Sequence, residues 1–340
     1  MTHATLSSAG SLGALDPDVA NLLALAQQAG YPPFEALTPA QARKAYAASW
    51  DAMQSPRTEV ASVHDVEIAA PHPLQLRVYR GQGTSPSEVL PCLLFLHGGG
   101  WVIGNLDSHD RMCRQLANVA RICVVAVDYR LAPEHPYPAA VDDAAAALRW
   151  IALHADTLHI DPHALGVGGD SAGGNLAAVL ALMARNGELP ALCYQALLYP
   201  VTDLTCSSAS YQRITHGYPL TAATMHYFIG HYTPERKRRE EWRASPLKAH
   251  SLQGVAPALV LTVSHDPLCD EGVAYAQRLD AAGVRVAALH FNDHIHGVLS
   301  QGRMVAMSNT MAQQVFTMIG DALHHTRKRL SATQTRVHAD

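Results

Sequence analysis

Apolar runs of strand length recur along the chain from residue 62 onward, separated by longer stretches with helical spacing. The first two runs, 62–68 and 74–80, are joined by a short link containing proline, which predicts an antiparallel pair of strands. Later runs alternate with helical stretches, which predicts right-handed crossovers and a mostly parallel sheet flanked by helices, an α/β fold. These later strands are expected at 92–96, 122–127, 165–168, 194–199, 258–263 and 284–291, and the helices near 108–120, 139–154, 172–186, 271–282 and after His296.

Two segments fall outside this alternation. Ahead of the sheet, Asp16 followed by Pro17 predicts a helix start, and Thr38 opens a second helix with a capping box. Between 203 and 242 the alternation stops, and a charged run at 235–241 is typical of a solvated helix face or loop. The aromatic residues of this stretch fit either the lining of a pocket or packing within the segment; they are Tyr218, Tyr227, Phe228 and Tyr232.

The composition narrows the class of protein. A chain of 340 residues with 48% hydrophobic residues can bury one large core with an inserted or appended cap. Charged residues make up only 16% and the net charge is −4, so neither nucleic acid nor a membrane surface is expected as a partner. The first residues do not resemble a signal peptide and no apolar run has the length of a membrane span, so we expect a cytoplasmic protein. The pattern leaves the oligomeric state open, a homodimer included.

Neither a cofactor nor a metal is expected from the motifs. The six cysteines form no C-x-x-C pair, and we expect buried thiols in a reducing compartment. No phosphate-binding loop, nucleotide fingerprint or metal-ligand cluster is recognisable. The pair His324-His325 lies in a basic tail that we expect to fray.

Glycines flank a serine where a predicted strand meets an alanine-rich helical stretch. Gly169-x-Ser171-x-Gly173 is the nucleophile-elbow pattern, in which a sharp strand-to-helix turn exposes the serine. The same turn places the Ala172 N–H at a helix N-terminus, where free donors and the helix dipole favour negative charge. Taken alone, the pattern also fits a glycine-rich turn with an incidental serine.

A second glycine-rich loop lies upstream and favours the nucleophile elbow over a turn with an incidental serine. The buried strand predicted at 92–96 leads into His97, Gly98, Gly99 and Gly100. A loop of this kind supplies oxyanion-binding amides in esterases and lipases, because adjacent glycines let backbone N–H groups approach a substrate oxygen closely. Two such loops, each after a buried strand and in the expected order, make coincidence a poor explanation.

On these loops the chain resembles the hormone-sensitive-lipase-like family of α/β-hydrolases, the bacterial family IV esterases, in the branch with the nucleophile motif Gly-Asp-Ser-Ala-Gly. The resemblance runs from about residue 15 to about residue 315 and includes further stretches at 128–136, 243–247, 266–272 and 294–297. It implies an α/β-hydrolase fold with a mostly parallel central sheet and a helical cap. With the pattern above, we expect N-terminal cap helices at 1–55, a core at 56–202 and 243–322, a second cap element at 203–242 and a disordered tail at 323–340.

A serine nucleophile needs a base, and the base needs a third group that fixes its tautomer. The chain order serine, acid, histidine is typical of this fold. Asp266 stands just past the predicted strand 258–263, at the end of the sheet where ligands bind in open α/β folds, and it matches the acid position of the family. Asp270 and Glu271 are interpreted as first-turn residues of the next helix.

Three histidines compete for the role of base. His290 lies within the predicted strand 284–291 and is expected to pack or to face solvent. Spacing alone allows either His294 or His296. The family pattern of histidine, glycine and a large apolar residue matches His296-Gly297-Val298, with valine where phenylalanine is more usual.

The resemblance implies a serine carboxylesterase. A pocket of fixed depth under two cap elements predicts small-molecule esters with short to medium acyl chains as substrates. Ser171 would be the nucleophile, His296 the base and Asp266 the acid. One alternative is an amidase or deacetylase, because acetamide-cleaving relatives share the motifs. Another is a non-catalytic small-molecule receptor, which the presence of all three residues disfavours.

The resemblance also implies roles for backbone and supporting groups. Backbone N–H groups of Gly98, Gly99 and Ala172 would hold the oxyanion of the tetrahedral intermediate. Asp170 is expected to brace the turn before the nucleophile. His97 is expected to orient the oxyanion loop rather than to act as a second base.

Overall fold

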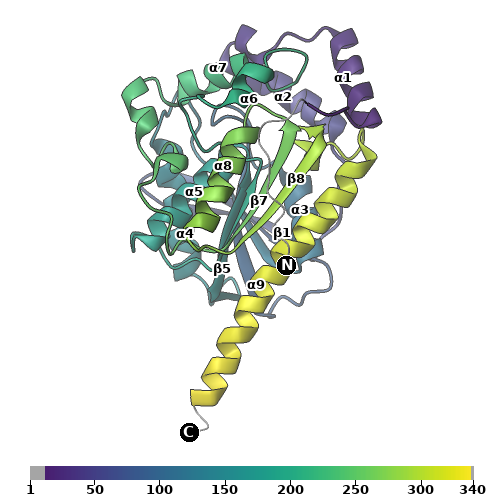
Figure 1. The fold of residues 1–340 in the computed structure, drawn as a ribbon. Coiled ribbons are helices and arrows are strands. Elements are labelled where there is room, and N and C mark those ends of the chain that lie inside the picture. The colour runs from purple at the N-terminus through teal and green to yellow at the C-terminus, as the bar shows by residue number, and fades with distance from the viewer. Residues whose placement is uncertain (1–11, 338–340) are drawn as a thin grey trace.

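A computed structural model describes residues 12–337, with side chains described for residues 12–326 (Figure 1). Within these residues one sheet is formed by β1 (Ser62–Ala69), β2 (Pro73–Arg80), β3 (Leu90–Leu96), β4 (Cys123–Val127), β5 (Ile160–Asp170), β6 (Tyr194–Leu198), β7 (Ala258–His265) and β8 (Val286–Ile295). Their order is β1-β2-β4-β3-β5-β6-β7-β8. β2 pairs antiparallel with β1 and β4, and the other neighbours are parallel. The predicted antiparallel pair and mostly parallel sheet are confirmed.

Helices cover both faces of this sheet (Figure 1). α3 (Asp110–Ala120) and α9 (Ala306–Val337) pack on one face, and α4 (Ala139–Leu153), α5 (Ala172–Arg185) and α8 (Cys269–Ala281) pack on the other. Strand β3 shows how the two cores separate. Cys92, Leu94 and Leu96 belong to the core under α4 and α5, whereas Leu93 and Phe95 belong to the core under α3 and α9. Side chains alternate between the faces of a strand, so a continuous apolar run is buried on both.

Four further helices gather at one end of the sheet (Figure 1). They are α1 (Pro17–Ala29), α2 (Pro39–Met53), α6 (Ala209–Arg213) and α7 (Ala222–Tyr232). The predicted starts of the first two are confirmed, because the Asp16 side chain accepts from Asp18 N at 2.9 Å and Thr38 forms a reciprocal capping box. Phe34, between α1 and α2, packs against Phe228 of α7 with ring centroids 5.8 Å apart. The two segments that lie outside the strand–helix alternation therefore contact each other.

Arg43 fastens α2 to the loops that follow β3 and β4. Its Nε donates to Val102 O at 2.8 Å, and its Nη2 donates to Ala132 O at 2.9 Å. The same guanidinium pairs with Glu134 Oε2 at 2.6 Å. The hydrogen bond with Arg43 lowers the pKa of Glu134 to about 2, so this pair remains ionised at neutral pH.

The carboxyl-terminal segment differs from its prediction. Instead of a disordered tail at 323–340, the chain continues α9 as far as Val337. Leu323 is fully buried, and His324 Nε2 lies 3.2 Å from the Ala120 carbonyl oxygen at the end of α3. Leu323 continues, at helical spacing, the buried apolar stripe that Phe316 and Ile319 form earlier in α9. Residues 1–11 and 338–340, parts of the expected cap and tail, lie outside the described residues. Within 12–337, no helix is both long and apolar enough to cross a membrane.

Candidate active site

Ser171 lies at the sharp turn between β5 and α5. Its backbone has φ 56° and ψ −118°, a left-handed conformation that is costly for a residue with a side chain. The flanking glycines permit the turn, because a Cβ atom on Gly169 or Gly173 would collide with the Leu96 carbonyl oxygen. Ser171 N donates to Leu198 O at 2.8 Å, which ties the turn to the neighbouring strand β6. The local sequence thus holds the serine hydroxyl at the carboxyl end of β5.

One histidine bridges this serine and a buried aspartate. His296 Nε2 lies 2.9 Å from Ser171 Oγ, and His296 Nδ1 lies 2.6 Å from Asp266 Oδ2. Strands β7 and β8 bring Asp266 and His296 together. The last residues of these strands, His265 and Ile295, are paired, and Asp266 and His296 are the next residues in the chain. Asp266 is 1% exposed and its Oδ1 accepts the backbone N–H two residues on at 2.8 Å. The structure therefore brings together the three side chains that the sequence analysis selects.

The other two histidines of this region have partners of their own. His294 Nδ1 lies 2.6 Å from Asp293 Oδ1, and the residue is buried. His290 Nδ1 lies 2.8 Å from Thr262 Oγ1. Strand β8 extends to Ile295, beyond the predicted 284–291, so both histidines are strand residues and His296 is the first residue after the strand.

The neighbouring acidic residues also have other partners. Asp270 Oδ1 pairs with Arg213 Nη2 at 2.7 Å. Glu271 is 1% exposed and accepts from Thr202 N at 2.6 Å, and burial raises its pKa well above the usual value. Both lie in the first turn of α8, as the sequence analysis expects. Asp266 is thus the carboxylate that contacts His296.

The backbone N–H groups of the loop after β3 correct one expectation. Gly98 N donates to Asp170 Oδ1 at 2.9 Å, so this amide is occupied and is not free to hold an oxyanion. Among the described residues, the N–H groups of Gly99, Gly100 and Ala172 donate to no hydrogen bond. Ala172 is the first residue of α5, where a helix leaves its N–H groups unpaired. The free donors on either side of Ser171 are therefore Gly99, Gly100 and Ala172.

His97 is a buried neutral residue beneath the same loop. Its Nδ1 lies 2.7 Å from Gly98 O, and its ring stacks on Tyr129 with centroids 4.2 Å apart. Burial lowers the pKa of His97 to about 3, with a further contribution from the nearby His109. A histidine of this pKa accepts protons too weakly to serve as a base near neutral pH.

Aromatic side chains from α2 and α7 lie against the loops of the site. Trp50 packs on the backbone of Gly297, where an added Cβ atom would lie 3.4 Å from the indole, and it stacks on Tyr46 with centroids 4.9 Å apart. Phe228 packs on Gly100 so closely that an added Cβ atom would collide with the ring. The sequence analysis identified Phe228 but missed Tyr46 and Trp50. Their i, i+4 spacing, which places both on one helix face, was the available signal.

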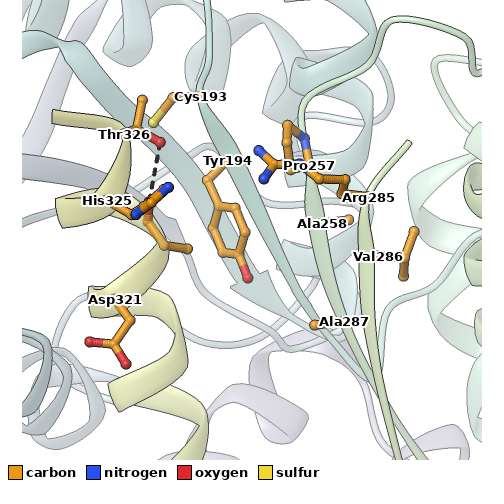
Figure 2. Close-up of a pocket in the computed structure, with 11 residues that line it drawn as sticks. Cys193, Tyr194, Pro257, Ala258, Arg285, Val286, Ala287, Asp321, His325 and Thr326 are labelled. Carbon is orange, nitrogen blue, oxygen red and sulfur yellow. Dashed lines mark hydrogen bonds between the residues drawn. The ribbon is translucent and has the colours of Figure 1, made fainter. Parts of the chain in front are cut away.

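A cavity of about 480 Å³ lies at the opposite end of the sheet (Figure 2). Tyr194, Ala258 and Val286 line it and are the first residues of β6, β7 and β8, whereas Asp266 and His296 follow the last residues of β7 and β8. Burial raises the pKa of the Cys193 thiol in this cavity to about 11, so it is protonated near neutral pH and a poor nucleophile. No cluster among the described residues has the three His, Cys, Asp or Glu side chains that a metal would need. The Ser171 end of the sheet is the candidate active site.

Comparisons with known proteins agree with this geometry. Residues 93–300 match a family model described as the alpha/beta hydrolase fold. An ethyl acetate hydrolase of Pseudomonas putida is 40% identical over 298 residues, which cover 86% of this chain and 94% of that protein. The carboxylic ester hydrolase LipN of Mycobacterium tuberculosis is 43% identical over 259 residues, which cover 74% of this chain and 67% of that protein.

Solved structures with a similar fold also belong to an esterase and an α/β-hydrolase. A thermostable esterase from Pseudomonas putida superposes with a TM-score of 0.87 at 36% identity, covering 93% of this chain and 99% of that one. An α/β-hydrolase from the metagenome of Lake Arreo, Spain, superposes with a TM-score of 0.86 at 40% identity, covering 90% and 98%. The chain therefore belongs to the α/β-hydrolase fold family, among its hormone-sensitive-lipase-like esterases, and is a carboxylic ester hydrolase.

Proposed function

We propose that Ser171, His296 and Asp266 hydrolyse carboxylic esters through an acyl-enzyme intermediate. The observation that carries this proposal is the imidazole of His296, which bridges Ser171 Oγ at 2.9 Å and Asp266 Oδ2 at 2.6 Å. Ser171 Oγ attacks the ester carbonyl carbon while its proton passes to His296 Nε2. Asp266 stabilises the imidazolium that forms and holds its Nδ1–H in the required tautomer.

The intermediate then collapses and water completes the cycle. The bond to the alkoxy oxygen breaks, and His296 Nε2 gives its proton to the leaving alcohol. A water molecule next gives a proton to His296 as its oxygen attacks the acyl carbon. Ser171 Oγ leaves and regains a proton from His296, and the carboxylic acid is released. Each proton taken up by His296 is thus returned within the same half-reaction.

We assign oxyanion binding to the N–H groups of Gly99, Gly100 and Ala172. Support for this assignment is that these amides have no hydrogen-bond acceptor among the described residues, while Gly98 N is held by Asp170. Each donor aimed at developing negative charge contributes substantially, since the loss of one lowers kcat by about 10²–10³-fold in a well-studied protease. The dipole of α5 adds to this stabilisation at Ala172.

We further propose that the segments 12–55 and 203–242 form a cap that sets the depth of the acyl pocket. The contacts of Trp50 with Gly297 and of Phe228 with Gly100 support it, because they place apolar rings from both segments against the reactive loops. Each acyl methylene that such a pocket buries contributes about 0.8 kcal/mol until the chain meets the wall. The preferred substrates are therefore short- to medium-chain esters. We also assign the chain to the branch with the Gly-Asp-Ser-Ala-Gly motif.

A series of p-nitrophenyl esters below their solubility limits tests this proposal. We expect kcat/KM to be highest at about four to eight acyl carbons and to fall steeply beyond about twelve. A maximum at palmitate, or a sharp rise in rate when the substrate forms an emulsion, would assign a lipase instead. Aryl acetamides in the same assay serve as the comparison, and a higher kcat/KM for them would assign an amidase.

A further inference from the structure

A buried histidine that is not one of the three proposed catalytic residues contacts Asp170, the residue before the nucleophile. His109 is the residue before α3 and is 1% exposed, and its Nε2 lies 3.2 Å from Asp170 Oδ1 and 3.4 Å from Oδ2. Asp170 is 4% exposed, and the same Oδ1 accepts from Gly98 N at 2.9 Å. One carboxylate thus joins His109 to the first glycine of the loop that carries Gly99 and Gly100.

Both ring nitrogens of His109 have hydrogen-bond partners. Its Nδ1 lies 2.9 Å from Ser108 Oγ. That hydroxyl also donates to Asn105 O at 2.8 Å. Its Nε2 faces the buried Asp170 carboxylate. The ring is therefore held at both nitrogens and directed at Asp170.

The contact with His109 helps to keep the Asp170 carboxyl ionised. Burial on its own raises the pKa of the Asp170 carboxyl, but the charge and hydrogen bond of His109, with His97 and Gly98 N–H, outweigh burial and lower it. An ionised carboxylate accepts the Gly98 N–H more strongly than a protonated one would. The position of the Gly98 peptide therefore depends on the contact between His109 and Asp170.

Close packing holds both the His109 ring and the loop that begins at Gly98. The ring of His109 lies between those of Trp50, Phe95 and His97, at centroid distances of 6.1, 6.3 and 5.5 Å. On the other side, an added Cβ atom on Gly98 would collide with the Asp170 carboxylate. His109 is thus fixed in position, and through Asp170 it fixes the start of the oxyanion loop.

We propose that His109 is a positioning residue for transition-state stabilisation: its imidazole ring orients Asp170, which holds the Gly98 peptide and so sets the direction of the free Gly99 and Gly100 N–H groups. The inference rests on the proposed function of that loop. It assigns His109 a role in kcat rather than in substrate binding, because the oxyanion exists only after the attack by Ser171.

The test compares His109→Ala with the matched control Leu116→Ala, which opens a cavity in the core on α3, the helix that begins directly after His109. For folded His109→Ala we expect kcat to fall by about 10- to 100-fold with KM within about twofold of wild type. Affinity for an alkyl trifluoromethyl ketone, which forms an oxyanion with Ser171, should fall by the same factor. Affinity for a non-hydrolysable ether of the substrate should not change. Leu116→Ala should lose stability and keep the kcat of its folded fraction.

A His109→Gln variant restores a donor to Asp170 without the packed ring and should recover part of the lost kcat. If His109→Ala does not fold, this variant decides the question: a loss of about threefold to tenfold in kcat supports the proposal, and wild-type kcat overturns it. An unchanged ketone affinity, or a loss confined to KM, also overturns it. Failure of the proposed function would look different, because a phosphonate would then not label Ser171 in the wild-type enzyme.

Discussion

His296 Nε2 lies 2.9 Å from Ser171 Oγ, although 125 positions separate the two residues in the chain. The serine follows β5 and the histidine follows β8, and these parallel strands end at the same edge of the sheet. The contact therefore depends on the whole fold rather than on a local motif. Its neighbour His294 is two residues away but bonds Asp293, which makes it a matched control for His296.

Replacing His296 by alanine should lower kcat by about 10⁴-fold or more, because no other base contacts Ser171 Oγ in the described structure. His294→Ala removes a buried ring of similar size, so we expect lower stability and a kcat of the folded protein within about threefold of wild type. Steady-state kinetics with urea unfolding curves measure both effects. A larger loss of kcat at His294 would reverse the assignment of the base.

Gly100→Ala should weaken substrate binding and stability together. Gly100 has φ 58°, and an added Cβ atom would collide with the Phe228 ring. We expect a loss of at least about 1–2 kcal/mol from the left-handed backbone alone, and a higher KM because α7 is displaced. Gly230→Ala in the same helix is the control, since no atom lies within 4 Å of its added Cβ atom. It should raise stability by about 0.5–1 kcal/mol, and equal effects of the two changes would contradict the packing.

Arg43→Ala should loosen α2 from the core and raise KM several-fold. The side chains of Arg43 and Glu134 are 31% and 55% exposed, so their ion pair contributes little by itself. The hydrogen bonds to the Val102 and Ala132 carbonyls contribute more, and we expect a total loss of about 1–3 kcal/mol. Lys44→Ala on the exposed side of the same helix should change stability by less than about 0.5 kcal/mol. Indistinguishable KM values for the two variants would argue against a cap held by Arg43.

Alkylation of Cys193 should be slow near neutral pH and leave hydrolysis intact. Its pKa is raised to about 11, so the reactive thiolate becomes more abundant with each rise in pH up to that value. Iodoacetamide labelling followed by peptide mass mapping should show the rate at Cys193 rising from pH 7 to pH 10. Loss of activity in proportion to labelling of Cys193 would mean that the cavity lined by Cys193 is linked to the reaction.

The parts of the fold that depend on short-range pattern were predictable. The Asp16 and Thr38 caps are set by residues within three positions, and the strand before the His97 loop is a continuous apolar run. The continuation of α9 past residue 323 was not, because Leu323 packs near Gly166 of β5 and His324 lies against the end of α3, both far away in the chain. Composition carries no information about such a partner.

In the candidate site, too, some residues were predictable from the sequence and others were not. The positions of Ser171, Asp266 and His296 follow from motifs at the ends of strands. The role of Gly98 does not, because its N–H is taken by a side chain 72 positions away. His109 was missed for the same reason, since it contacts the site through Asp170, which lies 61 positions away in the chain.

The central claim is that Ser171 is the nucleophile, and labelling with an active-site-directed p-nitrophenyl phosphonate tests it most directly. We expect one phosphonyl group per chain, on the peptide that contains Ser171, with p-nitrophenol release and loss of esterase activity in equal proportion and no labelling of folded Ser171→Ala. An adduct on another residue would contradict the account. So would a folded Ser171→Ala enzyme that has esterase activity and loses it to the phosphonate as the wild-type enzyme does.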